Sequence, residues 1–129
     1  MTEAASPSVS VEERRALARM VTQAFENWGL ETHESLAMLG LGREDAKRLV
    51  SYREGAPLAD DSEVLDRAGH ILGIHKHLRL LFPHDRENAY RWMKANNRAF
   101  DGRTPAEVVS AEGLLGLLRI RGYLGSPVA

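Results

Sequence analysis

Apolar residues recur at intervals of three and four positions along most of the chain, which is the spacing of one face of an α-helix. The first such segment starts at Ser10 and Glu13, whose spacing is that of a capping box at a helix N-terminus. It ends at Gly29, a residue type that commonly follows the last turn. The sequence therefore predicts a helix whose apolar face comprises Leu17, Met20, Val21, Ala24, Phe25 and Trp28.

Further helices are predicted over residues 62–82, which Pro83 ends, over residues 85–95, and in the leucine-rich segment 113–125. No strand-like alternation of useful length occurs, so the predicted fold class is all-α. The apolar arc of the long helix comprises Val64, Ala68, Ile71, Ile74, Leu78, Leu81 and Phe82.

Two short helices around a glycine turn are expected between residues 32 and 55, which is the outline of a helix-turn-helix. Thr32 is the expected cap of the first helix, Gly40-Leu41-Gly42 forms the turn, and the second helix runs over residues 43–54. The second helix offers basic side chains to DNA phosphates or bases: Arg43, Lys47, Arg48 and Arg53.

Acidic residues oppose this DNA-binding interpretation. Glu44 and Asp45 occupy the first turn of the second helix, and residues 1–60 carry 7 basic and 10 acidic side chains, a net charge of −3. Residues 61–129 carry 10 and 8, a net charge of +2. Because phosphate attraction supplies much of the affinity for DNA, the sequence leaves open whether the motif binds DNA or is only an element of the fold.

Composition narrows the class of protein. The 129 residues suffice for one domain or for two very small ones sharing a core. Cysteine is absent, which excludes disulfides, thiolate nucleophiles and cysteine-based zinc sites. No apolar run approaches the roughly 18 residues of a membrane span, and the first ten residues do not resemble a secretory signal. We therefore expect a cytoplasmic protein with no membrane partner.

Metal binding and catalysis find little support in the sequence. In the histidine cluster, His70 and His77 share a helix face but are two turns apart, and His75 points about 140° away. We expect a solvated pair and one histidine hydrogen-bonded at the margin of the core. No serine or cysteine nucleophile stands in a recognisable frame, and no phosphate-binding loop is present. The sequence predicts no enzyme, no metal and no cofactor.

The polar stretch "NNRAFDGRTPAEVVSAEG" (96–113) separates two helical segments. Asp101-Gly102 is a turn dipeptide, and Thr104, Pro105 and Glu107 are helix-start signals at the cap, first and third positions. These residues predict a stiff turn that leads into a short helix ending at Gly113. A connector explains them fully, but it leaves unexplained Asn96, Asn97, Arg98, Phe100 and Arg103.

A family resemblance accounts for this stretch. Residues 91–124 resemble the C-terminal toxin-binding domain of Xre/MbcA/ParS antitoxins, with its Trp-bearing helix, Asn-x-x-Phe/Leu-x-Gly-x-x-Pro turn and final helix. The upstream segment 36–50 resembles the Xre-like helix-turn-helix that often precedes this domain. The features that carry the resemblance are Trp92, Asn97, Phe100, Gly102, Thr104, Pro105, Gly113, Leu114, Arg121, Tyr123 and Leu124.

The resemblance implies a type II antitoxin that occludes the active site of a RES-type toxin, which consumes NAD or transfers ADP-ribose. It also implies that the antitoxin regulates its own operon. Expected segments are a disordered N-terminus (1–9), a helix-turn-helix-like region (10–59) and a dimerisation and toxin-binding domain (60–129). Trp92 and Leu124 are expected in the core. Aromatic and arginine side chains dominate binding hot spots, so the expected toxin contacts are Arg98, Phe100, Arg103, Arg119 and Tyr123.

Two partners besides the toxin are considered. The wide apolar arc of the helix over residues 62–82 can serve both the core and a homodimer, and operator DNA is a possible ligand of the helix-turn-helix. The alternative function is a DNA-binding transcriptional regulator without a toxin partner, whose C-terminal half only dimerises.

Overall fold

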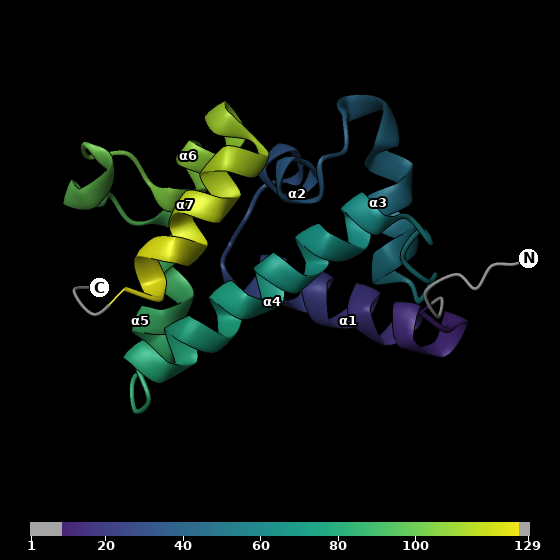
Figure 1. Ribbon diagram of the computed structural model, residues 1–129, viewed down its shortest axis with the longest axis horizontal. Helices are drawn as coiled ribbons and strands as arrows, with labels where there is room; N and C mark the ends of the chain where they lie inside the picture. The colour runs from purple at the N-terminus through teal and green to yellow at the C-terminus, as the bar shows by residue number, and fades with distance from the viewer. Residues whose placement is uncertain (1–8, 127–129) are drawn as a thin grey trace, which may run out of the picture.

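The structure, a computed structural model, describes residues 9–126 and is all-helical over that range, so the predicted fold class is confirmed. The N-terminal segment expected to be disordered lies outside the described residues, apart from Val9. Figure 1 shows the arrangement of the seven α-helices, which are α1 (Val11–Asn27), α2 (Thr32–Leu39), α3 (Ala46–Arg53), α4 (Ser62–Leu81), α5 (Arg86–Arg91), α6 (Pro105–Glu112) and α7 (Leu114–Leu124). Three short 3-10 turns supplement them: η1 (Arg43–Asp45), η2 (Trp92–Lys94) and η3 (Arg98–Phe100).

Side-chain caps begin the helices much as the sequence indicates. The Ser10 hydroxyl accepts from the backbone N–H of Glu13 (3.1 Å), and the Glu13 carboxylate accepts in return from the N–H of Ser10 (3.1 Å). At α2 the cap differs from the prediction, because Thr32 is already the first helical residue and Glu31 is the N-cap. Here the Glu34 carboxylate accepts from the backbone N–H of Glu31 (2.8 Å), so the capping box involves Glu31 and Glu34 and not the threonine.

Helix α4 is the central element of the core. It contacts α1, α2, α5 and α7, and Figure 1 shows it crossing the molecule in front of α1. The predicted arc is buried at Val64, Ala68, Ile71, Ile74 and Leu78. Leu81, expected to continue it, is 39% exposed because the helix ends there, beyond the neighbours that cover its other turns.

Met20 is a second departure from the predicted core. It is 48% exposed, although the sequence analysis placed it on the apolar face of α1. At about 100° per residue, Met20 lies roughly 100° from the neighbouring Val21, which is at the centre of the buried arc. Val21 itself is fully buried, so the covered face of α1 is narrower than the apolar pattern.

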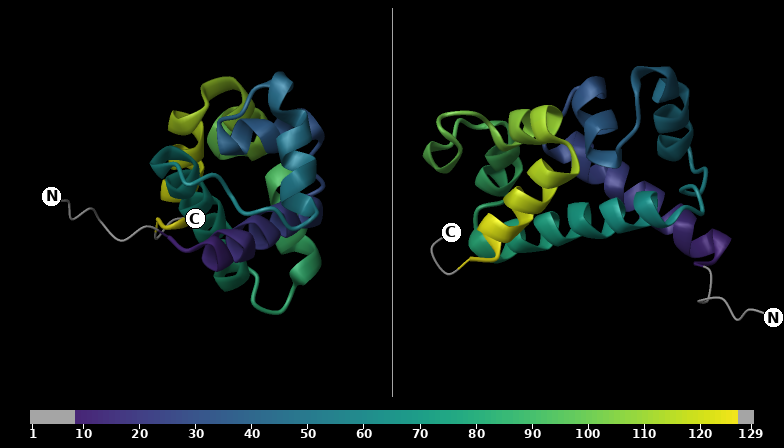
Figure 2. Two further views of the ribbon diagram at one scale, coloured as in Figure 1. Left: turned by 90° about the vertical axis from the view of Figure 1, so that its right-hand side faces the viewer. Right: turned by 45° about the horizontal axis from the view of Figure 1, so that its top comes forward.

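Contacts between α2 and α6 join the N-terminal region to the C-terminal part. Lys94, which follows α5, donates to both carboxylate oxygens of Glu34 on α2 (2.7 Å each), and Glu34 is only 5% exposed. One apolar core runs from α1 to α7, and Figure 2 shows the arrangement of these helices from two further sides. The division near residue 60 therefore stays a prediction, as does the helix-turn-helix assignment of α2 and α3, which are joined through Gly40 in a left-handed conformation (φ 71°).

Helices α6 and α7 approach closely at a glycine. Gly113, with φ 63°, reverses the chain between them. A Cβ atom built on Gly116 would lie 2.6 Å from the carbonyl oxygen of Val108, too close for any real side chain. Backbone of one helix thus packs directly against the other, and this contact fixes the orientation of α7.

We predict that Gly116→Ala lowers the free energy of unfolding by about 1–3 kcal/mol, because α6 and α7 must separate to admit the methyl group. Urea denaturation followed by circular dichroism measures the change. Gly122→Ala is the matched control: this exposed glycine of the same helix has no atom within 4 Å of an added Cβ. The control is expected to raise stability by about 0.5–1 kcal/mol. Equal effects of the two substitutions would contradict the close contact.

Candidate functional site

The polar stretch before α6 is a closed, hydrogen-bonded turn. The Asn97 backbone N–H donates to the carbonyl of Arg103 (3.1 Å), and the Asn97 carbonyl accepts from the N–H of Gly102 (3.0 Å). The Asn97 side chain accepts from the N–H of Ala99 (2.9 Å) and so begins η3. Asp101 (φ 60°) and Gly102 (φ 83°) both take left-handed conformations. The predicted turn is confirmed, and Asn97 is explained by its fold alone.

An aromatic cluster of Trp92, Phe100 and Tyr123 packs at this turn. The rings of Trp92 and Tyr123 stack with centroids 6.3 Å apart, and Phe100 meets each of them edge-to-face, at 6.5 and 5.3 Å. Phe100 is only 3% exposed, so it belongs to the core and offers little surface to a partner, and its role as a toxin contact stays a prediction. Leu124 is buried as expected, whereas Trp92, also expected in the core, is only partly buried against it, as is Tyr123.

Glu112 brings two of the predicted contact arginines together. Its carboxylate accepts from Arg119 (2.7 and 2.8 Å) and from Arg103 (3.1 Å). The hydrogen bond from Arg119 is the main cause that lowers the pKa of Glu112, so this carboxylate is ionised at neutral pH. Arg119 also lies 5.6 Å from the centroid of the Phe100 ring, within cation–π range. Arg119 and Arg103 are therefore held in place before any partner arrives.

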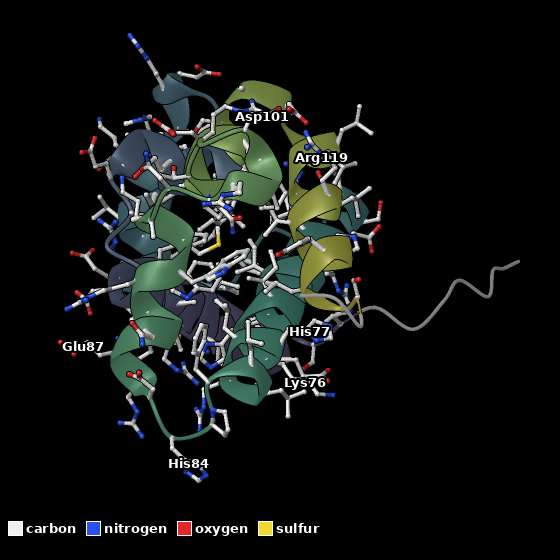
Figure 3. All side chains as sticks on the ribbon, turned by 90° about the vertical axis from the view of Figure 1, so that its left-hand side faces the viewer. Lys76, His77, His84, Glu87, Asp101 and Arg119 are labelled. Carbon is white, nitrogen blue, oxygen red and sulfur yellow. The ribbon has the colours of Figure 1, made fainter. Side chains whose placement is uncertain are left out.

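Arg98, the remaining predicted contact, is exposed at the start of η3 and forms no ion pair among residues 9–126. Figure 3 shows Asp101 of the same turn and Arg119 of α7 at one end of the molecule. The turn and the outer face of α7 thus contribute to the same region of the surface.

Sequence reasoning missed three exposed leucines on α7. Leu114, Leu115 and Leu118 are 39%, 71% and 41% exposed, while Leu117 and Ile120 on the opposite side of the helix are fully buried. The signal was present, because "LLGLL" has more apolar residues than one buried face can use. Exposed apolar side chains gathered on one helix face are typical of a protein interface.

The four side chains assigned to DNA are all exposed, but they do not form one cluster. Arg43 lies in η1, and Lys47, Arg48 and Arg53 lie on α3. At about 100° per residue, Arg48 and Arg53 project roughly 140° apart around the helix. Glu44 is exposed beside them, so the acidic opposition seen in the sequence persists in the structure.

The histidines lie differently from the expectation. His70, expected in solvent, is half-buried, and its Nδ1 lies 2.7 Å from Nη1 of Arg121, which makes it a hydrogen-bond acceptor between α4 and α7. Burial, and next the charge of Arg79, lower the pKa of His75. Among the described residues, no three His, Cys, Asp or Glu side chains are grouped so that they could hold a metal ion.

Comparison with known proteins assigns a family to these features. Residues 77–126 match the family described as the antitoxin Xre/MbcA/ParS C-terminal toxin-binding domain. The chain is also 30% identical over 100 residues to "Uncharacterized protein y4oB" of Sinorhizobium fredii (strain NBRC 101917 / NGR234), an alignment that covers 77% of this chain and 74% of that protein. The chain belongs to the Xre/MbcA/ParS antitoxin family.

The matched region of this antitoxin contains the turn, the aromatic cluster, the Glu112 ion pairs and the exposed leucines. An antitoxin with a toxin-binding domain has a toxin as its partner. No helix in the part of the chain that the structure describes is long and apolar enough to cross a membrane.

Proposed function

We propose that this antitoxin neutralises a RES-type toxin, one that consumes NAD or transfers ADP-ribose, by covering its active site with the turn over residues 96–104 and the outer face of α7. The observation that carries the proposal is the position of the exposed leucines, which lie beside Arg119 inside the matched toxin-binding domain. The type of toxin comes from the family resemblance of residues 91–124.

The chemistry of this surface suits occlusion. Apolar side chains at the centre of an interface supply most of the binding free energy, and arginines contribute hydrogen bonds and charge. Arg119 and Arg103 are already oriented by Glu112, so little side-chain entropy is lost when they contact a partner. A rigid surface that fills a pocket inhibits by excluding substrate, and no reacting group is needed.

We predict that Leu115→Glu abolishes neutralisation, because a carboxylate would be buried against the toxin without a partner. The measurement is growth rescue when the antitoxin and the toxin of the neighbouring reading frame are expressed from separate inducible promoters, followed by co-purification. A loss of affinity of at least about 100-fold is expected, in line with truncated hot spots.

Val50→Glu provides the matched control, since Val50 is 46% exposed on α3 and lies outside the matched domain. It is expected to rescue growth as well as the unaltered antitoxin does. Arg98→Glu should weaken rescue without changing the helical content, because Arg98 has no intramolecular ion pair among the described residues. Full rescue by Leu115→Glu would refute the proposed surface, and a harmless neighbouring product would refute the toxin assignment.

We further propose a homodimer in which two copies of α4 pack antiparallel. At about 100° per residue, Asp66, Gly69, Gly73 and Lys76 fall within an arc of roughly 80°. Asp66 and Lys76 are exposed, form no ion pair among residues 9–126, and are equidistant from Ile71, as are the two glycines. A two-fold axis at the level of Ile71 would place each Asp66 opposite the Lys76 of the second copy and allow close backbone approach at Gly69, whereas Gly73 is covered by the side chain of Arg121.

Charge reversal tests this dimer. Asp66→Lys or Lys76→Asp alone should weaken dimerisation by about tenfold or more at low ionic strength, because like charges then face each other across the axis. The double variant restores opposite charges and should dimerise like the unaltered protein. Sedimentation equilibrium measures the dissociation constant. Failure of the double variant to recover would rule out this register.

We also propose that the antitoxin regulates its own operon, because η1 and α3 carry exposed basic residues that could bind DNA. Residues 10–59 would then be the DNA-binding region and residues 60–129 the dimerisation and toxin-binding region. A regulator without a toxin partner is the competing function. The two differ in their requirements: a plain regulator binds its promoter alone, whereas an antitoxin also forms a complex with the neighbouring gene product.

We predict that Lys47→Ala with Arg48→Ala weakens binding to the DNA upstream of the reading frame by about tenfold and makes the affinity less dependent on salt, by about one unit of slope per lost phosphate contact. Fluorescence anisotropy across a salt series measures both quantities, with and without toxin. Arg86→Ala, an exposed arginine on α5, is the control and should bind normally. An unchanged affinity in the double variant would show that α3 does not contact the DNA.

A further inference from the structure

A cavity of about 430 Å³ lies between α1, α4 and α5, outside the proposed toxin-binding surface. This volume falls within the range of small-molecule sites, which is roughly 300–1,000 Å³. Its lining includes Arg19 and Ala24 from α1, Leu72, His75 and Arg79 from α4, and Tyr90 from α5. None of these residues belongs to the turn, to α7 or to η1 and α3.

The cavity carries positive charge that nothing nearby balances. No aspartate or glutamate lines it. Neither Arg19 nor Arg79 forms an ion pair within residues 9–126, whereas other arginines do: Arg15, Arg67, Arg91, Arg103 and Arg119. Two guanidinium groups without counter-ions at one cavity attract an anion, since each can donate two parallel hydrogen bonds to a carboxylate or phosphate.

Two carboxylates on the helices around the cavity, Glu87 and Glu26, contact other side chains and do not line it. Glu87 of α5 lies in Figure 3 on the side of that helix away from α4, and it is 3.5 Å from Arg91. Glu26 of α1 accepts from the Gln23 side chain (3.3 Å), which itself borders the cavity. Neither carboxylate is among the lining groups, so the formally charged side chains that line the cavity are the two arginines.

His75 adds a neutral donor to this charge. Burial and the adjacent Arg79 lower its pKa, so the imidazole is uncharged at neutral pH. The charged or titratable groups that line the cavity with it are Arg79 on its own helix, Arg19 on α1 and Tyr90 on α5. An anion bound here would favour the imidazolium form and so raise the pKa of His75.

The rest of the lining is apolar or aromatic. Ala24 is almost fully buried and Leu72 is partly buried against the core, and the half-buried Tyr90 stands at the α5 side. We propose that this cavity binds a small organic anion whose carboxylate or phosphate is held by Arg19 and Arg79 and whose apolar body contacts Ala24, Leu72 and Tyr90. The site is independent of the proposed toxin contacts and gives the antitoxin a second ligand.

Four probes test the site on the full chain by NMR titration of backbone amides and of the His75 imidazole: benzoate, phenyl phosphate, inorganic phosphate and benzamide. Benzoate or phenyl phosphate should shift signals of the lining residues saturably, with a dissociation constant of about 1 mM or tighter. The stronger of the two identifies the anionic group. Inorganic phosphate, which lacks the apolar body, should bind more weakly, and neutral benzamide should not bind.

Variants decide whether the arginines hold the anion. Arg19→Ala and Arg79→Ala should each weaken binding by about tenfold, the usual effect of losing one charge-assisted contact. Both side chains lack intramolecular ion pairs in the described residues, so the fold should persist, as circular dichroism can verify. Arg86→Ala removes the same charge from an exposed arginine of α5 that does not line the cavity, and should leave binding unchanged.

Several outcomes would overturn the proposal. These are the absence of saturable shifts with benzoate and phenyl phosphate, equal binding of benzamide, equal binding of inorganic phosphate, or equal weakening by Arg86→Ala. A bound anion that leaves the pKa of His75 unchanged would also overturn it, because the ligand would then lie outside the cavity.

Discussion

The burial of one face of α4 is the constraint on which the rest of the molecule depends. Four helices from both halves of the chain pack against this single twenty-residue helix. Burying an aliphatic side chain such as Ile71 or Ile74 stabilises the fold by roughly 1.5–3 kcal/mol, and neither has any exposed surface. The packing against α4 therefore determines the position of any partner-binding surface on α1, α5 or α7.

Polar contacts then connect the regions that α4 supports. Glu34 and Lys94, sixty residues apart, join the region proposed to bind DNA to the start of the toxin-binding domain. Because Glu34 is almost fully buried, loss of the Lys94 side chain would leave a buried carboxylate without its counter-ion, which costs more than loss of a surface pair. The buried ion pair between Glu34 and Lys94 therefore stabilises the packing of the N-terminal region against the C-terminal domain.

Features that depend on neighbouring residues in the chain could be predicted from the sequence. The caps at Ser10 and Thr104 and the turn at Asp101-Gly102 follow from side chains within a few residues of one another, and the structure confirms them. Features that depend on distant neighbours were not predictable. Phe100 was expected at the surface, but it is covered because Trp92 and Tyr123, from two other segments, close over it.

The candidate site shows the same division. Arginine was the right residue type for an interface, but nothing in the sequence indicated that one carboxylate, Glu112, would orient both Arg103 and Arg119. The exposed leucines were missed for a related reason. A helix that is apolar on several faces does not reveal which face the core will take, since that choice depends on what packs against it.

The bond between Arg121 and His70 bears on that ambiguity. Helix α7 has leucines on both its buried and its exposed sides. A rotation of the helix about its axis would therefore bury a different apolar face with little change in the apolar area removed from water. Arg121 lies over Gly73 so closely that a Cβ there would be 2.7 Å from its Nε, and it ends on the imidazole of His70. Together with the close backbone contact at Gly116, this hydrogen bond fixes the rotation of α7 and so determines which leucines are buried in the core and which are exposed to a partner.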